Sequence, residues 1–568
     1  MTRFVAVLGP EADEGAFQAM KEAARREAWR IMEIGSRLWV ATDRAVVARL
    51  PHASGELLII GEVVTSSPLL ISGKTVDALC RDLSESLWGR YIALLLGPDQ
   101  VLSGVFRDPS GAVDCAVSRS GSTWLVASDA SAWMIEATND RPALSWRTVA
   151  EVLRDPITLS SADLVAGWKT VPPGGLHLPD GRNRQIWSPA QAARHSSPTD
   201  AAGLRATVDA AVTGLVGRRT SVLAEVSGGL DSAIMASSLL AGGFRGRAVW
   251  LNTCGPYAES DERAYARAVA ETLGVELTIM SRSARDLVDG LALDHPRSLR
   301  PSLNKLDAAY DALQADLCER HGVEGVLTGK GGDVAFMQTA SSSILADQIR
   351  DCGLGALLTP TAPVLARRMR RSAWRTMRAA LVSARRPHDY APSANGLLHP
   401  DIRQMEGASH PWLQDVADLG PAKRQQVVGF TSNLGLHSGS LRNARADLLH
   451  PALSQPVMEA VLATPAYELT RGGHDRLLAR EAFADRLPAA LIQRRSKAEL
   501  GGYYGRVLAA NIDRLRPHLL EGHLARQGLI DRGQVEAALQ VEHLIWQGGY
   551  LELMMLSLVE SWVSAWLG

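Results

Sequence analysis

The chain has 568 residues, well beyond the ~250–300 residues at which a single hydrophobic core stops growing, so we expect at least two domains. Hydrophobic residues make up 46% and charged residues 21% of the sequence, which is typical of a folded globular protein and excludes a disordered chain. A formal net charge of −1 gives no indication of a nucleic-acid or membrane-surface partner.

The cysteines and the apolar runs bear on where the protein works. The five cysteines contain no C-x-x-C pair, which argues against a zinc site and against a disulfide framework. The opening sequence MTRFVAVLGP lacks the long apolar core of a signal peptide, and the sequence contains no run of ~18 apolar residues. We therefore expect a cytoplasmic protein without a membrane segment.

The first part of the chain, residues 1–195, is predicted to contain short strands with a few helices beside them. Apolar runs broken by Gly, Pro, Asp or Ser predict strands at Phe4–Leu8, Leu38–Thr42, Leu57–Val64, Tyr91–Leu96, Val101–Phe106 and Thr123–Ala127. Helical patterns lie at Glu14–Arg30 and Thr75–Leu87. This mixture indicates layers of α and β structure.

The second part, residues 196–568, changes to longer helices that alternate with compact apolar runs. Helices are predicted at Gly203–Val216, Ala264–Leu273 and Asp307–Arg320, and strands at Ser221–Val226 and Gly325–Thr328. Strands that alternate with helices are typical of a parallel sheet with crossover helices. The Pro- and Gly-rich stretch from Pro172 to Pro189 is the predicted junction between the two domains.

One motif indicates a nucleotide site. The predicted strand Ser221–Val226 runs directly into Ser227-Gly228-Gly229-Leu230-Asp231-Ser232, and a helical pattern follows. A strand, a Gly-rich turn and a helix N-terminus form an anion site, because free backbone N–H groups and the helix dipole converge there. The glycines allow close approach of a phosphate, and Asp231 is placed to hold a magnesium ion. No lysine follows the glycines, so this is not the GxxxxGK[ST] loop of kinase-like NTPases.

The motif S-G-G-x-D-S resembles the pyrophosphate loop of the asparagine-synthetase family, and further matches extend over nearly the whole chain. In the first part they are Gly89-Arg90-Tyr91, Arg107-Asp108-Pro109-Ser110-Gly111, and Val171-Pro-Pro-Gly-Gly175 with Trp187. In the second part they are Leu327-Thr328-Gly329-Lys330-Gly331-Gly332-Asp333, Arg480, Leu487-Pro488, and Arg494-Arg495-Ser496-Lys497.

This resemblance implies an α/β fold with two parts and an ATP site. The N-terminal part would be a glutaminase-like, Ntn-hydrolase-like sandwich, and the C-terminal part a parallel-sheet ATP-pyrophosphatase domain with a helical insertion. ATP and Mg²⁺ are the implied cofactors, with Asp231 and Asp333 facing each other as catalytic residues and metal ligands. Lys497 would stabilise charge at the α-phosphate, although a solvated basic cluster explains it equally well from sequence alone. The implied nucleotide-binding residues are Val226, Ser227, Gly228, Gly229, Asp231, Ser232, Thr328 and Gly329.

Two departures from the family pattern concern the source of the amine. Glutamine-hydrolysing members carry an N-terminal cysteine nucleophile after methionine removal, whereas this chain has Thr2, and Ile60-Gly61-Glu62-Val63 replaces the family's N-G-E-I. We interpret residues 1–195 as a former glutaminase domain kept for structure. Lys330 stands where the family has a glutamate, and a cation there can neither orient nor deprotonate an amine, so free aspartate and ammonia become less favoured substrates.

A third departure is a long helical insertion with many arginines and no acidic residue among them. The arginines are Arg367, Arg368, Arg370, Arg371, Arg375, Arg378, Arg385 and Arg386. Such a run usually forms one solvated helix face, and we expect Val364, Leu365, Trp374 and Leu381 to pack inward beneath it. The alternative is a docking surface for an acidic peptide or partner protein.

Within the superfamily, the sequence most resembles the lasso-peptide cyclases, which are macrolactam synthetases related to beta-lactam synthetase. The stretches that carry this likeness are Leu448–Glu459, Arg471–Phe483 and Arg494–Lys497. The implied partners are a precursor (core) peptide as substrate, a leader peptidase and a leader-recognition protein. The alternatives are an ammonia-dependent asparagine synthetase or a beta-lactam-synthetase-like ligase, a non-catalytic scaffold, and a tRNA-thiolating enzyme.

Overall fold

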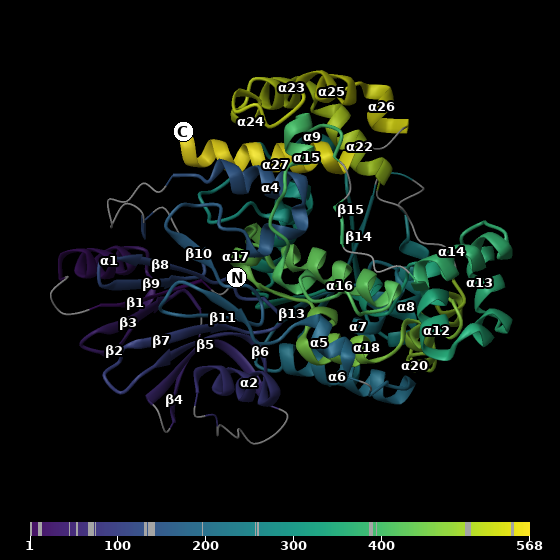
Figure 1. The fold of residues 1–568 in the computed structure, drawn as a ribbon, viewed down its shortest axis with the longest axis horizontal. Helices are drawn as coiled ribbons and strands as arrows, with labels where there is room; N and C mark the ends of the chain where they lie inside the picture. The colour runs from purple at the N-terminus through teal and green to yellow at the C-terminus, as the bar shows by residue number, and fades with distance from the viewer. Residues whose placement is uncertain are drawn as a thin grey trace.

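The computed structural model describes residues 3–9, 14–44, 46–52, 55–65, 73, 75–129, 133–134, 143–195, 197–255, 257, 261–283, 285–385, 390–392, 395–494, 501–546 and 550–568 (Figure 1). No helix among these residues is long and apolar enough to cross a membrane.

Two six-stranded antiparallel sheets stack in the N-terminal part. The first has the order β10 (Trp168–Thr170), β8 (Ala116–Ser120), β9 (Thr123–Ala127), β1 (Phe4–Leu8), β3 (Leu38–Thr42), β2 (Arg30–Gly35). The second has the order β12 (Asn183–Gln185), β11 (Gly175–His177), β7 (Leu102–Arg107), β6 (Leu87–Leu96), β5 (Gly55–Thr65), β4 (Val47–His52).

Side-chain alternation along β1 explains why the sheets stack. Phe4, Ala6 and Leu8 face the apolar core between the two sheets. Val5 and Val7 face the opposite side, because successive side chains of a strand point to opposite faces. Both faces of the first sheet are therefore buried. The second sheet carries α2 (Val76–Ser86) on its outer face.

The C-terminal part is built on a five-stranded parallel sheet, as the sequence predicts. Its order is β15 (Leu277–Ser281), β14 (Ala248–Cys254), β13 (Val222–Glu225), β16 (Gly325–Leu327), β17 (Asp447–Leu449). One face packs against α6 (Ala201–Val216), α7 (Leu230–Ala241) and α8 (Arg263–Leu273), and the other against α10 (Ala308–Arg320). The mixed α/β class predicted from the sequence is confirmed.

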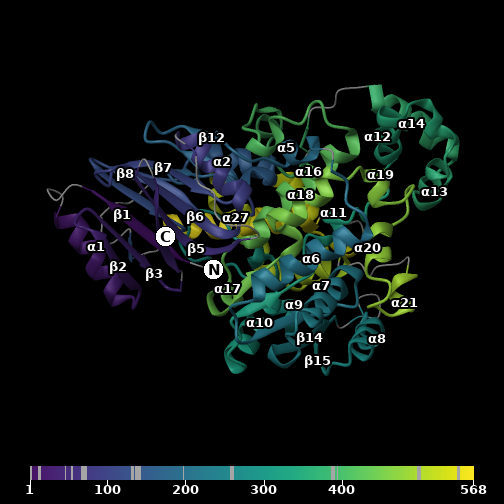
Figure 2. The same cartoon turned by 90° about the horizontal axis from the view of Figure 1, so that it is seen from below.

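Two groups of helices extend from this sheet. The helical insertion contains α12 (Ser342–Cys352), α13 (Thr361–Arg368) and α14 (Ala373–Arg385). Figures 1 and 2 both place it at the end of the molecule opposite α1 (Glu14–Arg26) and β2. The last helices, from α22 (Gly501–Ala510) to α27 (Tyr550–Leu567), share one apolar cluster with the outer face of the first sheet. The two parts of the chain therefore have a common core.

The structure corrects two details of the sequence-based prediction. The helix expected over Glu14–Arg30 ends at Arg26, because Ala28 has a φ of +58° and Arg30 begins β2. Trp374, expected to pack inward, is 81% exposed. Helix α14 buries the row that contains Thr376 and Ala380, and this row leaves Trp374 on the outer face.

Candidate active site

The Gly-rich motif lies at the carboxyl edge of the parallel sheet, where open α/β folds bind ligands. It connects the central strand β13 to α7. Val226 continues the line of β13, since its N–H donates to Leu251 O (2.7 Å) and its carbonyl accepts from the Asn252 amide (2.7 Å). These two hydrogen bonds fix the backbone of Val226, from which the loop begins.

Two serines shape the loop that follows. The Ser227 N–H donates to Ser232 Oγ (3.1 Å), the Gly229 N–H donates to Ser227 Oγ (3.2 Å), and the two hydroxyl oxygens lie 2.9 Å apart. Gly228 has a φ of +90°, a left-handed conformation that favours glycine. No described side chain caps the amino end of α7. The first amides of α7 and its positive dipole end are therefore oriented toward the space where an anion can bind.

The second Gly-rich loop, Thr328–Asp333, packs directly on the first. A Cβ atom added to Gly329 would lie 2.4 Å from the Ser232 nitrogen, and one added to Gly332 would lie 2.7 Å from Asp231 Cβ. Real Cβ contacts are essentially never shorter than 3.0 Å, so only glycine permits this approach. The backbone of the second loop at Gly329 and Gly332 therefore packs against Asp231 and Ser232 of the first loop.

Asp231 is held by an arginine that the sequence analysis did not assign. Arg476 Nη1 lies 2.8 and 3.1 Å from the two carboxylate oxygens of Asp231, and both side chains are buried. Arg476 has a φ of +48°, which is uncommon for a residue other than glycine and concentrates at functional sites. The contact joins residues 245 positions apart, so no local sequence signal predicts it.

Two further arginines hold the C-terminal segment against the site. Arg480 ion-pairs with Asp475 (2.5 Å), the residue before Arg476, and donates to the carbonyl of Leu491 (3.0 Å). Arg494 donates to the carbonyl of Gly228 in the first loop (3.0 Å). The sequence matches at Arg480 and Arg494 thus lie on the candidate site. Lys497, Arg495 and Ser496 lie outside the described residues, and so do Thr2 and Arg386.

These residues fit the phosphates of ATP and are compatible with one divalent cation. Asp333 is exposed, and its carboxylate accepts from the Val334 N–H (3.1 Å). No cluster of three or more His, Cys, Asp or Glu side chains that could hold a metal occurs among the described residues. Mg²⁺ usually keeps several waters and is bound through one or two carboxylates plus substrate phosphates, so Asp231 and Asp333 would suffice. Asp231 would then share its charge with Arg476.

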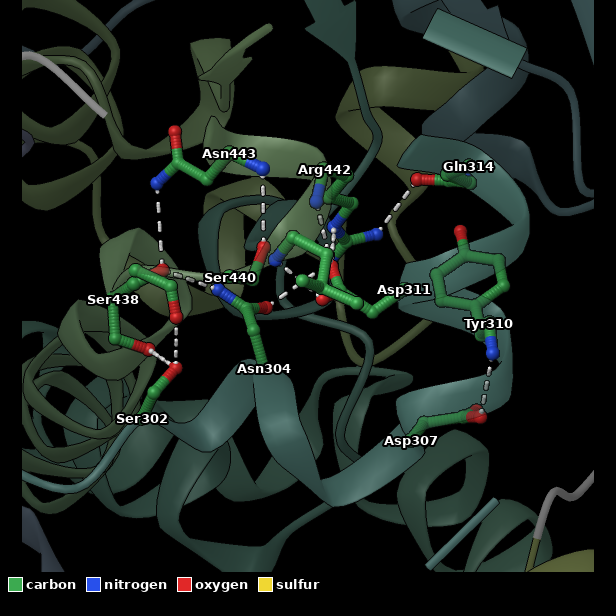
Figure 3. Close-up of polar contacts among 12 residues, drawn as sticks. Ser302, Asn304, Asp307, Tyr310, Asp311, Gln314, Ser438, Ser440, Arg442 and Asn443 are labelled. Atoms are coloured by element: carbon green, nitrogen blue, oxygen red, sulfur yellow. Dashed lines mark hydrogen bonds and ion pairs between the residues drawn. The ribbon is translucent and has the colours of Figure 1, made fainter. Parts of the chain in front are cut away.

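A polar network centred on Arg442 lies beside the end of the central strand, and Figure 3 shows its contacts with Asn304, Asp311 and Gln314. Arg442 donates to Gln314 Oε1 (2.8 Å) and to Asn304 Oδ1 (2.9 Å). Its guanidinium lies 3.8 Å from Glu225, the last residue of β13, and Glu225 also accepts from the Tyr310 hydroxyl (2.5 Å). Asn304 and Gln314 are buried with Arg442, and Glu225 and Tyr310 are half-buried, so the network positions the strand that leads into the phosphate loop.

Lys330 lies in the second loop, in the electrostatic field of this network. Burial, together with the positive charge of Arg442, lowers the pKa of Lys330 to about 8, while Glu225 acts in the opposite direction. This finding revises the expectation that Lys330 is a permanent cation. The lowered pKa makes the neutral, proton-accepting form of Lys330 accessible at mildly alkaline pH.

The stretch that replaces the family's N-G-E-I takes part in an ion-pair network between the two parts of the chain. Glu62 pairs with Arg219 (2.9 Å), and Arg219 also pairs with Asp447 (2.6 Å). Arg90, from the other matched stretch, lies 3.3 Å from Asp447. Ile60 is fully buried between the two sheets. These side chains of the N-terminal part connect it to the edge strand β17.

A cavity of about 790 Å³ lies between the first antiparallel sheet and the segments around residues 295–305 and 434–444. Buried His437 lines it and packs against His450, with ring centroids 5.0 Å apart. The Nδ1 atom of His450 forms a hydrogen bond with the hydroxyl of Thr328 in the second loop (2.7 Å). A continuous line of buried side chains therefore connects this cavity to the candidate nucleotide site.

Comparison with known proteins gives a family match and two weak structural likenesses. No curated protein matches the sequence. The structure of the allosteric regulatory enzyme of purine biosynthesis has 11% sequence identity and a TM-score of 0.21, and the alignment covers 57% of this chain and 89% of the enzyme's chain. Glutamine phosphoribosylpyrophosphate amidotransferase from B. subtilis, complexed with ADP and GMP, has 10% sequence identity and a TM-score of 0.21. The alignment covers 58% of this chain and 81% of the amidotransferase chain. At these TM-scores neither likeness supports an argument.

The family match covers most of the C-terminal part. The family model described as asparagine synthase matches residues 203–567, which is more than half of the chain. This range contains both Gly-rich loops, Arg442, Arg476 and Lys497. Members of this family use ATP, in general together with Mg²⁺. The chain therefore belongs to the asparagine synthase family and is an ATP-dependent, AMP-forming carbon–nitrogen ligase.

Proposed function

We propose that this ligase is a lasso-peptide macrolactam cyclase, which joins a side-chain carboxylate of a peptide to the N-terminal amine of the same peptide. The observation that carries the proposal is Ile60, a fully buried aliphatic side chain at the position where glutamine-hydrolysing relatives carry the asparagine of N-G-E-I. The next two residues, Gly61 and Glu62, match that pattern, and Glu62 pairs with Arg219 of the C-terminal part (2.9 Å). Without ammonia from glutamine, the substrate's own amine is the simplest nucleophile.

The proposed chemistry runs in two balanced steps. The side-chain carboxylate of an Asp or Glu attacks the α-phosphate of ATP bound on Ser227–Ser232, giving an acyl-adenylate and pyrophosphate. The peptide's N-terminal amine then attacks the acyl carbon, the amide bond forms, and AMP leaves. Arg476 and Lys497 would stabilise negative charge on the phosphates, while Asp231 and Asp333 would hold Mg²⁺, which neutralises the triphosphate when bound.

Lys330 is the residue that we propose as the acceptor of the amine's proton. It stands in the loop that packs on Asp231 and Ser232, and its lowered pKa of about 8 makes a neutral side chain available. The cavity of about 790 Å³ is separated from Thr328 by the packed side chains of His437 and His450, so it is not the space in which the substrate meets ATP. A core peptide is favoured over aspartate because its own amine takes the place of ammonia.

Reconstitution tests the proposal. Purified enzyme with ATP, Mg²⁺ and a leader-free core peptide, with the processing protease and the leader-recognition protein added if the reaction requires them, should give a product lighter by one water. Fragmentation should place the new bond between the N-terminus and an internal Asp or Glu, and N-acetylation of the peptide should stop the reaction. Incubation with glutamine should release no glutamate above background. Efficient conversion of aspartate and ammonia to asparagine, with every peptide left linear, would contradict the cyclase assignment and favour a synthetase.

A further inference from the structure

The outer face of the helical insertion combines unpaired positive charge with exposed apolar side chains. Residues 353–385 contain seven arginines and no Asp, Glu or Lys. In the described structure, only Arg368 among them has its guanidinium bound, to the carbonyls of Gly473 (2.6 Å) and Gln338 (2.7 Å). The other six are exposed and make no ion pair with a described residue, namely Arg367, Arg370, Arg371, Arg375, Arg378 and Arg385.

Large apolar side chains are exposed among these arginines. Of the eleven large hydrophobic side chains exposed in the described part of the chain, four lie between residues 354 and 382. They are Leu354, Leu358, Trp374 and Val382, and Leu358 is 92% exposed. Along α14, Trp374, Arg378, Val382 and Arg385 are spaced by four, four and three residues, so they share one helix face. Apolar and cationic groups therefore alternate on a single stripe.

The inner face of α14 is already occupied by the core. Thr376 and Ala380 are buried, and Met377, Leu381 and Ala384 pack against the main apolar cluster. Membrane binding by a surface helix needs a continuous apolar face that enters the lipid, whereas the outer face of α14 alternates Trp374 and Val382 with Arg378 and Arg385. Arginine between exposed aromatic and aliphatic groups suits protein recognition instead, because a guanidinium pairs with carboxylates in a bidentate geometry and Trp and Arg dominate interface hot spots.

The insertion also lies next to the candidate active site. Leu365 of α13 packs on Gly473, where an added Cβ would lie 2.8 Å from Leu365 Cγ. Arg368 lies 3.9 Å from Asp475, and the next residue, Arg476, clamps Asp231. Helix α13 is therefore connected to Asp231 of the phosphate loop through Arg368, Asp475 and Arg476.

We propose that the stripe on α14 and the adjoining arginines form a docking surface for an acidic segment of a partner protein, with an apolar side chain of that segment seated against Trp374. Charge complementarity supports this occupant, since six unpaired guanidinium groups meet no carboxylate of the described chain. This proposal is independent of the proposed cyclase activity, because the docking surface involves no residue that we assign to the reaction.

A binding assay with a model peptide tests the surface. The probe is a fluorescent twelve-residue peptide of alternating glutamate and leucine, and the variant combines Trp374→Ala, Arg375→Gln, Arg378→Gln and Arg385→Gln. The wild type should bind the probe in a salt-sensitive manner, and the variant should bind it about tenfold or more weakly. A matched control, Arg25→Gln/Arg26→Gln/Arg37→Gln, removes three exposed arginines at the other end of the molecule and should bind like the wild type.

Further measurements test whether the variant is still folded and whether the surface binds lipid or nucleic acid instead. The variant should keep the wild-type unfolding midpoint and ATP–pyrophosphate exchange, which shows that any loss is local. Equal binding of the acidic probe by wild type and variant would overturn the proposal. Tighter wild-type binding to phosphatidylserine vesicles or to a single-stranded oligonucleotide, lost in the same variant, would also overturn it by assigning the surface to lipid or nucleic acid.

Discussion

The contact between the two Gly-rich loops allows a sharp test, Gly329→Ala. The added methyl would lie 2.4 Å from the Ser232 nitrogen, and an ordinary contact begins at 3.4 Å, so one loop must move by about 1 Å. Overpacking of this kind costs about 1–3 kcal/mol of unfolding free energy. Since the loop also positions Lys330 and Asp333, a displacement of this size should lower turnover by a factor on the order of 10².

Two measurements check this prediction. Urea denaturation gives the change in unfolding free energy, and ATP–pyrophosphate exchange with substrate gives the loss of activity. Gly246→Ala is the matched control, because a Cβ there meets no atom within 4 Å, and it should behave like the wild type. Wild-type stability together with wild-type exchange in Gly329→Ala would refute the close packing of the loops on which the proposed site rests.

Four other predictions concern the charged groups of the site. Arg476→Ala should cost about 3 kcal/mol in urea denaturation, because it removes the guanidinium that pairs with the buried Asp231 carboxylate, and a loss below about 1 kcal/mol would argue against the clamp. Asp231→Asn and Asp333→Asn should each abolish AMP and pyrophosphate release, and full turnover by either would remove the metal assignment. The rate of ligation should rise with pH through about 8, as Lys330 loses its proton. The Lys330→Arg variant stays charged and should be slow at every pH. An unchanged pH profile of the rate in Lys330→Met would exclude Lys330 as the base. Lys497→Ala should lower turnover by a factor on the order of 10²–10³ with ATP binding nearly unchanged, and weak ATP binding with normal turnover would mark a ground-state contact.

The sequence predicts those parts of the structure whose signal is local. Strands β1, β3 and β9 begin and end where the apolar runs do, and the phosphate loop follows from its glycines between a strand and a helix. The contact of Arg476 with Asp231 spans 245 residues, so it depends on how distant segments pack. Strand β17 is only three residues long, and a run of that length has no distinctive pattern. The division of the chain near residue 195 stays a prediction.

The apolar cluster shared by the first sheet and the last helices has a consequence for biosynthesis. Val5 and Val7 leave the ribosome early, whereas Leu553 and Trp562, which belong to the same cluster, are made last. At about 5–20 residues per second, roughly 30–110 s separate the two ends of the chain. During this time the outer face of the nascent sheet lacks its C-terminal cover, and its apolar side chains stay exposed. A deletion of the last helix should therefore impair folding of the first strands, and residues 1–195 expressed alone should aggregate.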